Sequence, residues 1–439
     1  MWGEDRALSF LKDLIKKLPY ERKEVCLHIN SQELTRYANN IIHQNVAEEN
    51  LNLYIRVGEG NKKVAISTSN LEGKSLENLI KDLDTLLKSQ PDTEELYLPD
   101  PEPIPSYEKK TFDPSPEKRA DIVKKLIDKA EKHNLNTFGA ISEEIGEIAV
   151  VNSKGLESYG TYAYSHGKVM YMGDGSGYQE EIGKDVDSID YESLSERALQ
   201  KCIDSKNPQE IDPGIYTVIL EPLAVGELLE QIAYFGFSAK AVQEKRSFIS
   251  LYQGQKIFKD NITIYDNGYD PNGIIFPIDF EGVPKKHVDL IKNGIVMGPV
   301  YDTTTAVKEG KNSTGHALPP PSTYPLPFNL FFVAGEKPLS KIISETEKGI
   351  LVTRFHYVNA FLDPIRVLAT GMTRDGTFLI ENGKITKPLK NLRFTQSFIE
   401  VLSNVEEISK ETYLVPNIGF ARVPAIKVLA FNFTGKTEF

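Results

Sequence analysis

The apolar pattern of this 439-residue chain changes at Ile211-Asp212-Pro213-Gly214, and this change constrains the fold more than any other feature. Before it, helical periodicities alternate with strand-like stretches. After it come a strand over 216–220, a helix opened by Pro222 and lasting to about 236, and then mostly short strands between Gly, Pro and Asn turns. We therefore expect an α+β protein of two domains. The first, 1–210, mixes helices and strands, and the second, 211–439, is mostly antiparallel β with a few helices.

The elements expected in each half follow from apolar spacing and turn residues. Apolar residues recur at helical spacing over 7–18, 75–89, 116–133, 192–203 and 396–404. Alternation predicts strands over 25–29, 51–57, 63–68, parts of 136–172, and 425–433, with a turn at 152–155 and a loop at 174–177. Ser75 and Ser115 are expected to cap their helices, and Ser193 with Glu196 to form a capping box. The prolines between about 91 and 116 predict an extended connection.

Composition excludes several classes of function. Lys and Arg number 51 against 62 Asp and Glu, a formal charge of −11, which argues against a broad nucleic-acid-binding surface. No segment reaches ~18 consecutive apolar residues, and the charged N-terminus does not resemble a signal peptide. We therefore expect a cytoplasmic protein with no membrane span. Its two cysteines, Cys26 and Cys202, are expected to be unpaired core thiols.

The histidines do not form a zinc-peptidase motif. A HExxH helix needs two closely spaced histidines and a glutamate that follows the first. The seven histidines here are widely separated, and none precedes a glutamate. Their positions are 28, 43, 133, 166, 287, 316 and 356. The sequence thus predicts no helix-borne zinc site, while a metal site assembled from distant residues stays open.

Other motifs favour ordinary structural interpretations. There is no G-x-S-x-G elbow, and Ser313-Thr314-Gly315-His316 is expected to be a polar loop. Gly173 to Gly177 opens no helix and contains an aspartate, so we expect a turn rather than a phosphate site. Carboxylate pairs such as Glu143-Glu144 and Glu180-Glu181 support no acid–base role without geometry.

An ordered set of short motifs covers nearly the whole chain and resembles the TldD/PmbA family, the modulators of DNA gyrase. In the first half they are Arg36-Tyr37-Ala38-Asn39-Asn40 and Asn152-Ser153-Lys154-Gly155-Leu156-Glu157. In the second half they are Asp279-Phe280-Glu281-Gly282-Val283-Pro284, Leu290-Ile291-Lys292-Asn293-Gly294, Asn312-Ser313-Thr314-Gly315, Lys348-Gly349-Ile350-Leu351-Val352-Thr353, 374–383 and Val423-Pro424-Ala425-Ile426-Lys427-Val428.

This resemblance implies one of two kinds of subunit. The TldD kind binds zinc through a HExxxH helix and a cysteine near the C-terminus, and the TldE (PmbA) kind lacks these ligands and pairs with it. When Leu228-Leu229 and Gly236 are aligned with that helix, Glu230, Gln231 and Phe235 occupy the first histidine, glutamate and second histidine positions. No cysteine follows Cys202. The resemblance is therefore to the TldE kind, and we expect Phe235 to pack in the core.

The resemblance implies a subunit without catalytic, metal-binding or cofactor-binding residues of its own. We expect it to be no enzyme alone, and to pair with a TldD-like zinc metallopeptidase that degrades peptides and unfolded proteins. Zinc is then expected in the partner. The alternative is a stand-alone peptide-binding or scaffold protein, as a homodimer. A direct action on DNA or gyrase rests on the family's name alone, and the charge of −11 argues against DNA contact.

Overall fold

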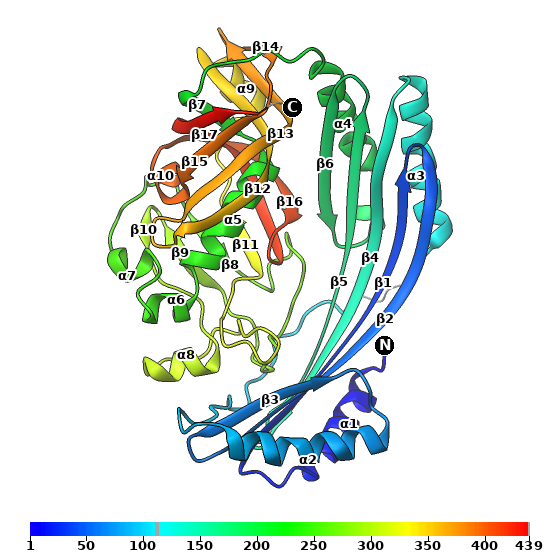
Figure 1. Ribbon diagram of the computed structural model, residues 1–439, viewed down its shortest axis with the longest axis vertical. Helices are drawn as coiled ribbons and strands as arrows, with labels where there is room; N and C mark the ends of the chain where they lie inside the picture. The colour runs from blue at the N-terminus through cyan, green and yellow to red at the C-terminus, as the bar shows by residue number, and fades with distance from the viewer. Residues whose placement is uncertain (110–113, 438–439) are drawn as a thin grey trace.

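The computed structural model describes residues 1–109 and 114–437, which form a long curved sheet facing a β-rich second half (Figure 1). Residues 110–113 of the expected proline-rich connection lie outside the described residues. The predicted α+β class, with a mostly β second domain, is confirmed. No helix in the described ranges has both the length and the apolar content that a membrane crossing requires.

The first sheet is antiparallel throughout, in the order β3-β2-β1-β4-β5-β6. Asn39 and Asn40 join its first two strands along the chain, both with positive φ, as a two-residue hairpin turn requires. Since a strand rises ~3.3 Å per residue, the first strand is ~55 Å long. The strands are β1 (Arg22–Ala38), β2 (Ile41–Glu59), β3 (Lys62–Thr68), β4 (Asn136–Asn152), β5 (Glu157–Met172) and β6 (Ser176–Gly183).

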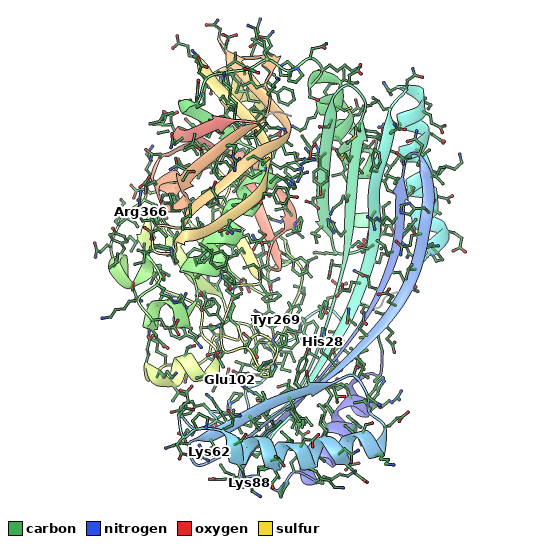
Figure 2. All side chains as sticks on the ribbon, in the orientation of Figure 1. His28, Lys62, Lys88, Glu102, Tyr269 and Arg366 are labelled. Carbon is green, nitrogen blue, oxygen red and sulfur yellow. The ribbon has the colours of Figure 1, made fainter. Side chains whose placement is uncertain are left out.

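One edge of this sheet is only partly paired. β3 pairs with β2 over 53–59 alone. In the described part of the chain, residues 41–52 of β2 therefore have no strand partner on the side away from β1. At the lower end of Figure 2, Lys62 of β3 donates from Nζ to the Lys88 carbonyl oxygen at 3.3 Å, which ties β3 to the helix beside it.

The helices of the first half all pack on one face of the sheet. Successive side chains of a strand point to opposite faces, so Val25, Leu27 and Ile29 lie on the helix-covered face, while Cys26 and His28 lie on the other. The second half contacts that other face, where Phe276 and Phe280 pack against Ile148. The helices are α1 (Glu4–Lys16), α2 (Gly73–Ser89), α3 (Pro116–Lys132) and α4 (Tyr191–Asp204), with a short 3₁₀ turn, Val186–Ser188.

Two of the predicted helix caps are wrong. Ser115 caps α3 as expected, and its hydroxyl accepts from the Lys118 N–H at 3.2 Å. Ser75, however, lies inside α2, which begins after Glu72. In α4 the cap is Asp190, whose carboxylate accepts from the Ser193 N–H at 3.0 Å. Asp190 is as good a cap as serine and lies upstream, so Ser193 becomes the third residue of the helix.

The second sheet contains a closed ring of strands. β7 (Gly214–Leu220) runs parallel to β12 (Lys348–Asp363) and antiparallel to β17 (Phe420–Lys436). β13 (Leu368–Glu381) and β15 (Leu392–Ser397) complete the ring. The helix α5 (Pro222–Gly236) packs against β12 and β17 in the largest apolar core. Further strands extend the sheet: β8 (Ile264–Asp266), β9 (Val288–Lys292), β10 (Ile295–Val296), β11 (Asn329–Phe332), β14 (Lys384–Pro388) and β16 (Val405–Pro416).

The second half is less fragmented than the sequence predicts. β12, β13 and β17 contain 16, 14 and 17 residues, because each of them pairs with two or more neighbouring strands of the sheet. The helix expected over 396–404 is shorter at its start, since Gln396 and Ser397 belong to β15. The short helices are α6 (Ala239–Gln243), α7 (Ile249–Tyr252), α8 (Thr303–Lys308), α9 (Leu339–Ser344) and α10 (Phe398–Ser403).

The two halves meet along a packed and hydrogen-bonded junction. The Ser158 hydroxyl donates to the Gly282 carbonyl oxygen at 2.7 Å. Gly282 has φ of +77°, and a Cβ there would lie 2.8 Å from Leu156, so the turn can approach the sheet only with glycine. The expected division between residues 210 and 211 falls in the connection from α4 to β7 and stays a prediction.

Candidate functional site

The helix α5 holds the three positions that the sequence singles out. Pro222 opens it at a position where no amide donor is needed, and apolar side chains surround most of its length. Phe235 is 4% exposed, and its ring centroid lies 5.0 Å from that of Phe361. Residues five apart on a regular helix are rotated by ~140° about its axis, so Glu230 and Phe235 do not share a face.

These positions do not fit a zinc ion. Zinc takes thiolate, imidazole and carboxylate ligands, usually four in a structural site and three in a catalytic site. Glu230 offers one carboxylate, Gln231 offers an amide, and Phe235 has no donor atom. Across 1–109 and 114–437, no group of three or more His, Cys, Asp or Glu side chains is placed to hold a metal ion.

A second glutamate, Glu227, lies one turn before Glu230 on the same face of α5. Burial raises the pKa of Glu227 to about 7, and the nearby charge of Glu230 adds to the rise while Arg354 opposes it. Burial also raises the pKa of Glu230. A carboxyl group that titrates near neutrality can both give and take a proton, which is the property a general acid–base group needs.

Arg354 on β12 is held firmly beside this pair. Its Nε donates to Asp375 Oδ2 at 2.8 Å, and its Nη2 reaches the same oxygen at 2.5 Å. Its guanidinium lies 4.2 Å from the ring centroid of Tyr178 on β6, in a cation–π contact. Ser176 Oγ donates to the other Asp375 oxygen at 2.8 Å, so both halves of the chain position the guanidinium.

Glu180 on β6 completes the arrangement. Burial acts to raise the pKa of Glu180, but the hydrogen bond from His166 and the charge of Lys168 outweigh it and lower the pKa. The His166 Nε2 to Glu180 Oε2 distance is 2.9 Å, and Lys168 Nζ lies 3.5 Å from the same oxygen. We name the whole set the interdomain cluster: Glu227 and Glu230 from α5, Arg354, Asp375, Tyr178, Glu180 and His166.

Sequence reasoning identified the helix but missed this cluster. Glu180 appeared only as one of many carboxylate pairs, and Glu227, Arg354 and Asp375 were given no role. One signal was available: Glu227 and Glu230 are the only charged residues within the otherwise apolar run Pro222–Gly236. Two carboxylates at helical spacing on a buried helix require polar partners, and those partners come from strands far away in the sequence.

The remaining candidate residues lie elsewhere and are structural. Cys26 and Cys202 are free and buried, as expected. The segment 313–316 is a loop, but a buried one. His316 Nε2 lies 2.9 Å from Asp266 Oδ1, and its Nδ1 lies 2.9 Å from the Thr314 hydroxyl. Since that hydroxyl also bonds to the backbone of Tyr301, it is not free to attack a substrate.

Comparison with known proteins relates the second half to a peptidase family. A family model described as the PmbA/TldA metallopeptidase C-terminal domain matches residues 213–435. An uncharacterized protein of Methanocaldococcus jannaschii is 30% identical over 329 residues, covering 70% of this chain and 74% of its own length. A metalloprotease TldD homolog of Haemophilus influenzae is 26% identical, over 52% of this chain. The chain spans about half the length of that relative, 47%.

A solved structure shares the complete fold. The crystal structure of TldE from Thermococcus kodakarensis matches with a TM-score of 0.88, over 97% of this chain and 99% of its own. The two sequences are 22% identical, so the match bears on the fold alone. Both architectures described above, the curved sheet and the ringed second half, are therefore shared across most of the length of a known protein.

Proposed function

The chain belongs to the TldD/PmbA family, and from this we propose that it is a TldE-like, non-catalytic subunit. In this role it pairs with a TldD-like zinc metallopeptidase and takes part in the degradation of peptides and unfolded proteins. The observation behind the proposal is the chemistry of α5, where Glu230, Gln231 and Phe235 stand at the three positions of the zinc motif.

The interdomain cluster supports the same proposal. Glu227 and Glu230 supply carboxylates, but the cluster adds Arg354 and a histidine already bonded to Glu180 rather than free nitrogen ligands. A guanidinium close to a prospective metal site repels a cation. The cluster therefore has the chemistry of a polar junction between the two halves, and peptide hydrolysis is left to the partner.

The first experiment measures metal and activity of the purified chain. We expect no stoichiometric zinc by elemental mass spectrometry and no cleavage of a fluorogenic peptide. When the chain is mixed with a HExxxH-bearing relative from the same source, we expect a complex on size-exclusion chromatography and cleavage that a chelator stops. Stoichiometric zinc with chelator-sensitive cleavage by this chain alone would overturn the proposal.

A pair of matched variants distinguishes the catalytic role of the partner from the role of this chain. Replacing the motif glutamate of the partner by glutamine is expected to abolish cleavage by the complex. Glu230→Gln in this chain is expected to leave it within about twofold, because no step of hydrolysis passes through Glu230. If the chain forms no complex with any such relative and elutes as a homodimer or monomer, the alternative role, stand-alone peptide binding or scaffolding, replaces the first.

A further inference from the structure

The face of the first sheet that meets the second half presents a stripe of aromatic and polar side chains. In the β4–β5 register, Glu144 pairs with Tyr164 and Gly146 with Tyr162, so these residues share one face. His28 of β1 lies on the same face. A Cβ at Gly146 would lie 2.2 Å from the Tyr162 ring, so the absent side chain lets that ring lie against the strand.

A cavity of about 350 Å³ opens between this stripe and two groups of residues of the second half. One consists of the aromatic residues Phe276, Phe280 and Phe328, from two separate stretches of the chain, and the other is the turn from β16 to β17 over 416–420. The rings contact one another across the junction. Tyr162 and Phe276 have centroids 4.8 Å apart, and Tyr164 and Phe420 4.9 Å apart. In Figure 2, His28 lies where the strands approach the loops of the second half.

One carboxylate, that of Glu144, faces this aromatic cavity. Its Oε2 accepts from the Tyr164 hydroxyl at 2.7 Å, and its Oε1 accepts from Tyr162 at 3.3 Å. Burial raises the pKa of Glu144, although both tyrosine hydrogen bonds oppose the rise. The carboxylate is therefore half-buried and held in place, and its hydrogen-bond partners Tyr162, Tyr164 and Gln32 carry no positive charge.

The other groups around the cavity leave this negative charge uncompensated. Among the described residues that line it there is no lysine or arginine. Burial lowers the pKa of His28 to about 4, so its ring, 2.9 Å from the Tyr162 hydroxyl, is neutral at pH 7. His166 is engaged with Glu180. The amine of Lys285, 5.4 Å from the Phe328 centroid, is buried beside Asp266 and Asp279, which offset its charge.

We propose that this cavity binds a primary ammonium group, from a lysine side chain or a peptide N-terminus, through Glu144 and the surrounding rings. Aromatic faces attract ammonium ions, and a half-buried carboxylate forms a strong charge-assisted hydrogen bond with them. The apolar walls suit the methylene chain that precedes a lysine ammonium. The volume lies within the range of small-ligand pockets. The proposal does not rest on the pairing with a catalytic subunit.

The test uses the isolated full chain and four tripeptide amides in isothermal titration calorimetry. The probes are acetyl-Ala-Lys-Ala-amide, its norleucine and acetyl-lysine counterparts, and Ala-Ala-Ala-amide with a free N-terminus. We expect the first or the last to bind at least tenfold more tightly than the two probes without an ammonium group, because hydrogen bonds between charged groups are stronger than those between neutral groups. Which of the two binds identifies the source of the ammonium.

Glu144→Gln keeps the shape and the hydrogen-bond acceptor and removes the charge, so it should weaken binding at least tenfold. The control is Glu157→Gln, at an exposed carboxylate on β5 that pairs with Lys12 outside the cavity. Equal binding of the lysine and norleucine peptides, together with no preference for a free N-terminus, overturns the proposal. So does unchanged affinity in Glu144→Gln. If circular dichroism shows that this variant does not fold, the comparison of the four peptides on the wild-type chain still tests whether the cavity binds an ammonium group.

Discussion

Arg56 on β2 and Glu281 in the second half form a buried ion pair, with Nη1 donating to Oε1 at 2.9 Å. The same guanidinium donates from Nε to Glu24 on β1 at 2.8 Å. All three side chains are buried. One arginine thus joins two strands of the first sheet to a turn of the second half, in surroundings where an unpaired charge is costly.

Arg56→Met should therefore lower the free energy of unfolding by about 3–5 kcal/mol, since it leaves two buried carboxylates without their cation. Urea unfolding followed by circular dichroism measures the loss. The control is Arg366→Met, which removes an exposed pair with Glu400 at the periphery (Figure 2) and should cost at most about 1 kcal/mol. Equal losses in the two variants would contradict the role assigned to Arg56.

Glu227 should make stability depend on pH. Its pKa in the folded chain, about 7, lies above the ordinary value of 4.5, so the folded chain holds this proton more tightly than the unfolded chain does. The stabilisation is complete below pH 4.5 and is lost as the pH rises through 7. Glu227→Gln should remove this contribution, on the order of 1–3 kcal/mol, and flatten the fall of the unfolding free energy between pH 4.5 and 7. A variant with the wild-type pH profile would show that the carboxyl group titrates normally.

Phe235 should matter for packing. Phe235→Ala removes a ring that is 4% exposed and contacts Phe361, and we expect a loss of about 3–5 kcal/mol in urea unfolding. The neighbouring Tyr234 is 42% exposed, so Tyr234→Ala should cost less than half as much. If the order of the two losses is reversed, Phe235 does not belong to the core of the helix.

The two cysteines should be unreactive in the native chain. Burial raises the pKa of the Cys202 thiol to about 11 and that of Cys26 well above its usual value, and the thiolate is the reactive form. At pH 8, Ellman's reagent should modify neither cysteine within minutes, and both after denaturation in guanidinium chloride. Rapid modification of one thiol in the native state would show that its region opens readily.

The local features of the fold could be predicted from the sequence where one residue determines the outcome. Pro222 fixes the start of α5, and the turn at 152–155 joins β4 to β5 as expected. Ser193 shows where this fails: Asp190, three residues earlier, offers the same capping chemistry, and only the path of the chain selects between them. The ring closed by β7 and β17 depends on pairing across about two hundred residues, and no local pattern contains that information.

The same reasoning applies to the interdomain cluster. The sequence could predict that Glu230, Gln231 and Phe235 lie on one helix, because apolar spacing is a local pattern. The pKa of Glu227, in contrast, depends on burial and on Arg354 and Glu180, which belong to other strands. A titratable residue can be identified in the sequence. The burial and the neighbouring charges that set its pKa arise only when distant segments pack together.

Residues 41–52 of β2 have no strand partner on the side away from β1, and this open edge affects how the molecule can associate with other polypeptides. An open strand presents a row of amides and carbonyls that another polypeptide can extend, which is how sheets aggregate. Ile41 and Ile42 at its tip are exposed and would favour such growth. Glu48 and Glu49 lie farther along the same edge. Glu49 pairs with the N-terminal ammonium at 3.0 Å, and repulsion between the Glu48 carboxylates opposes the stacking of identical chains. The open edge of the longest hairpin thus has an apolar tip that favours pairing with another chain and acidic residues that oppose it.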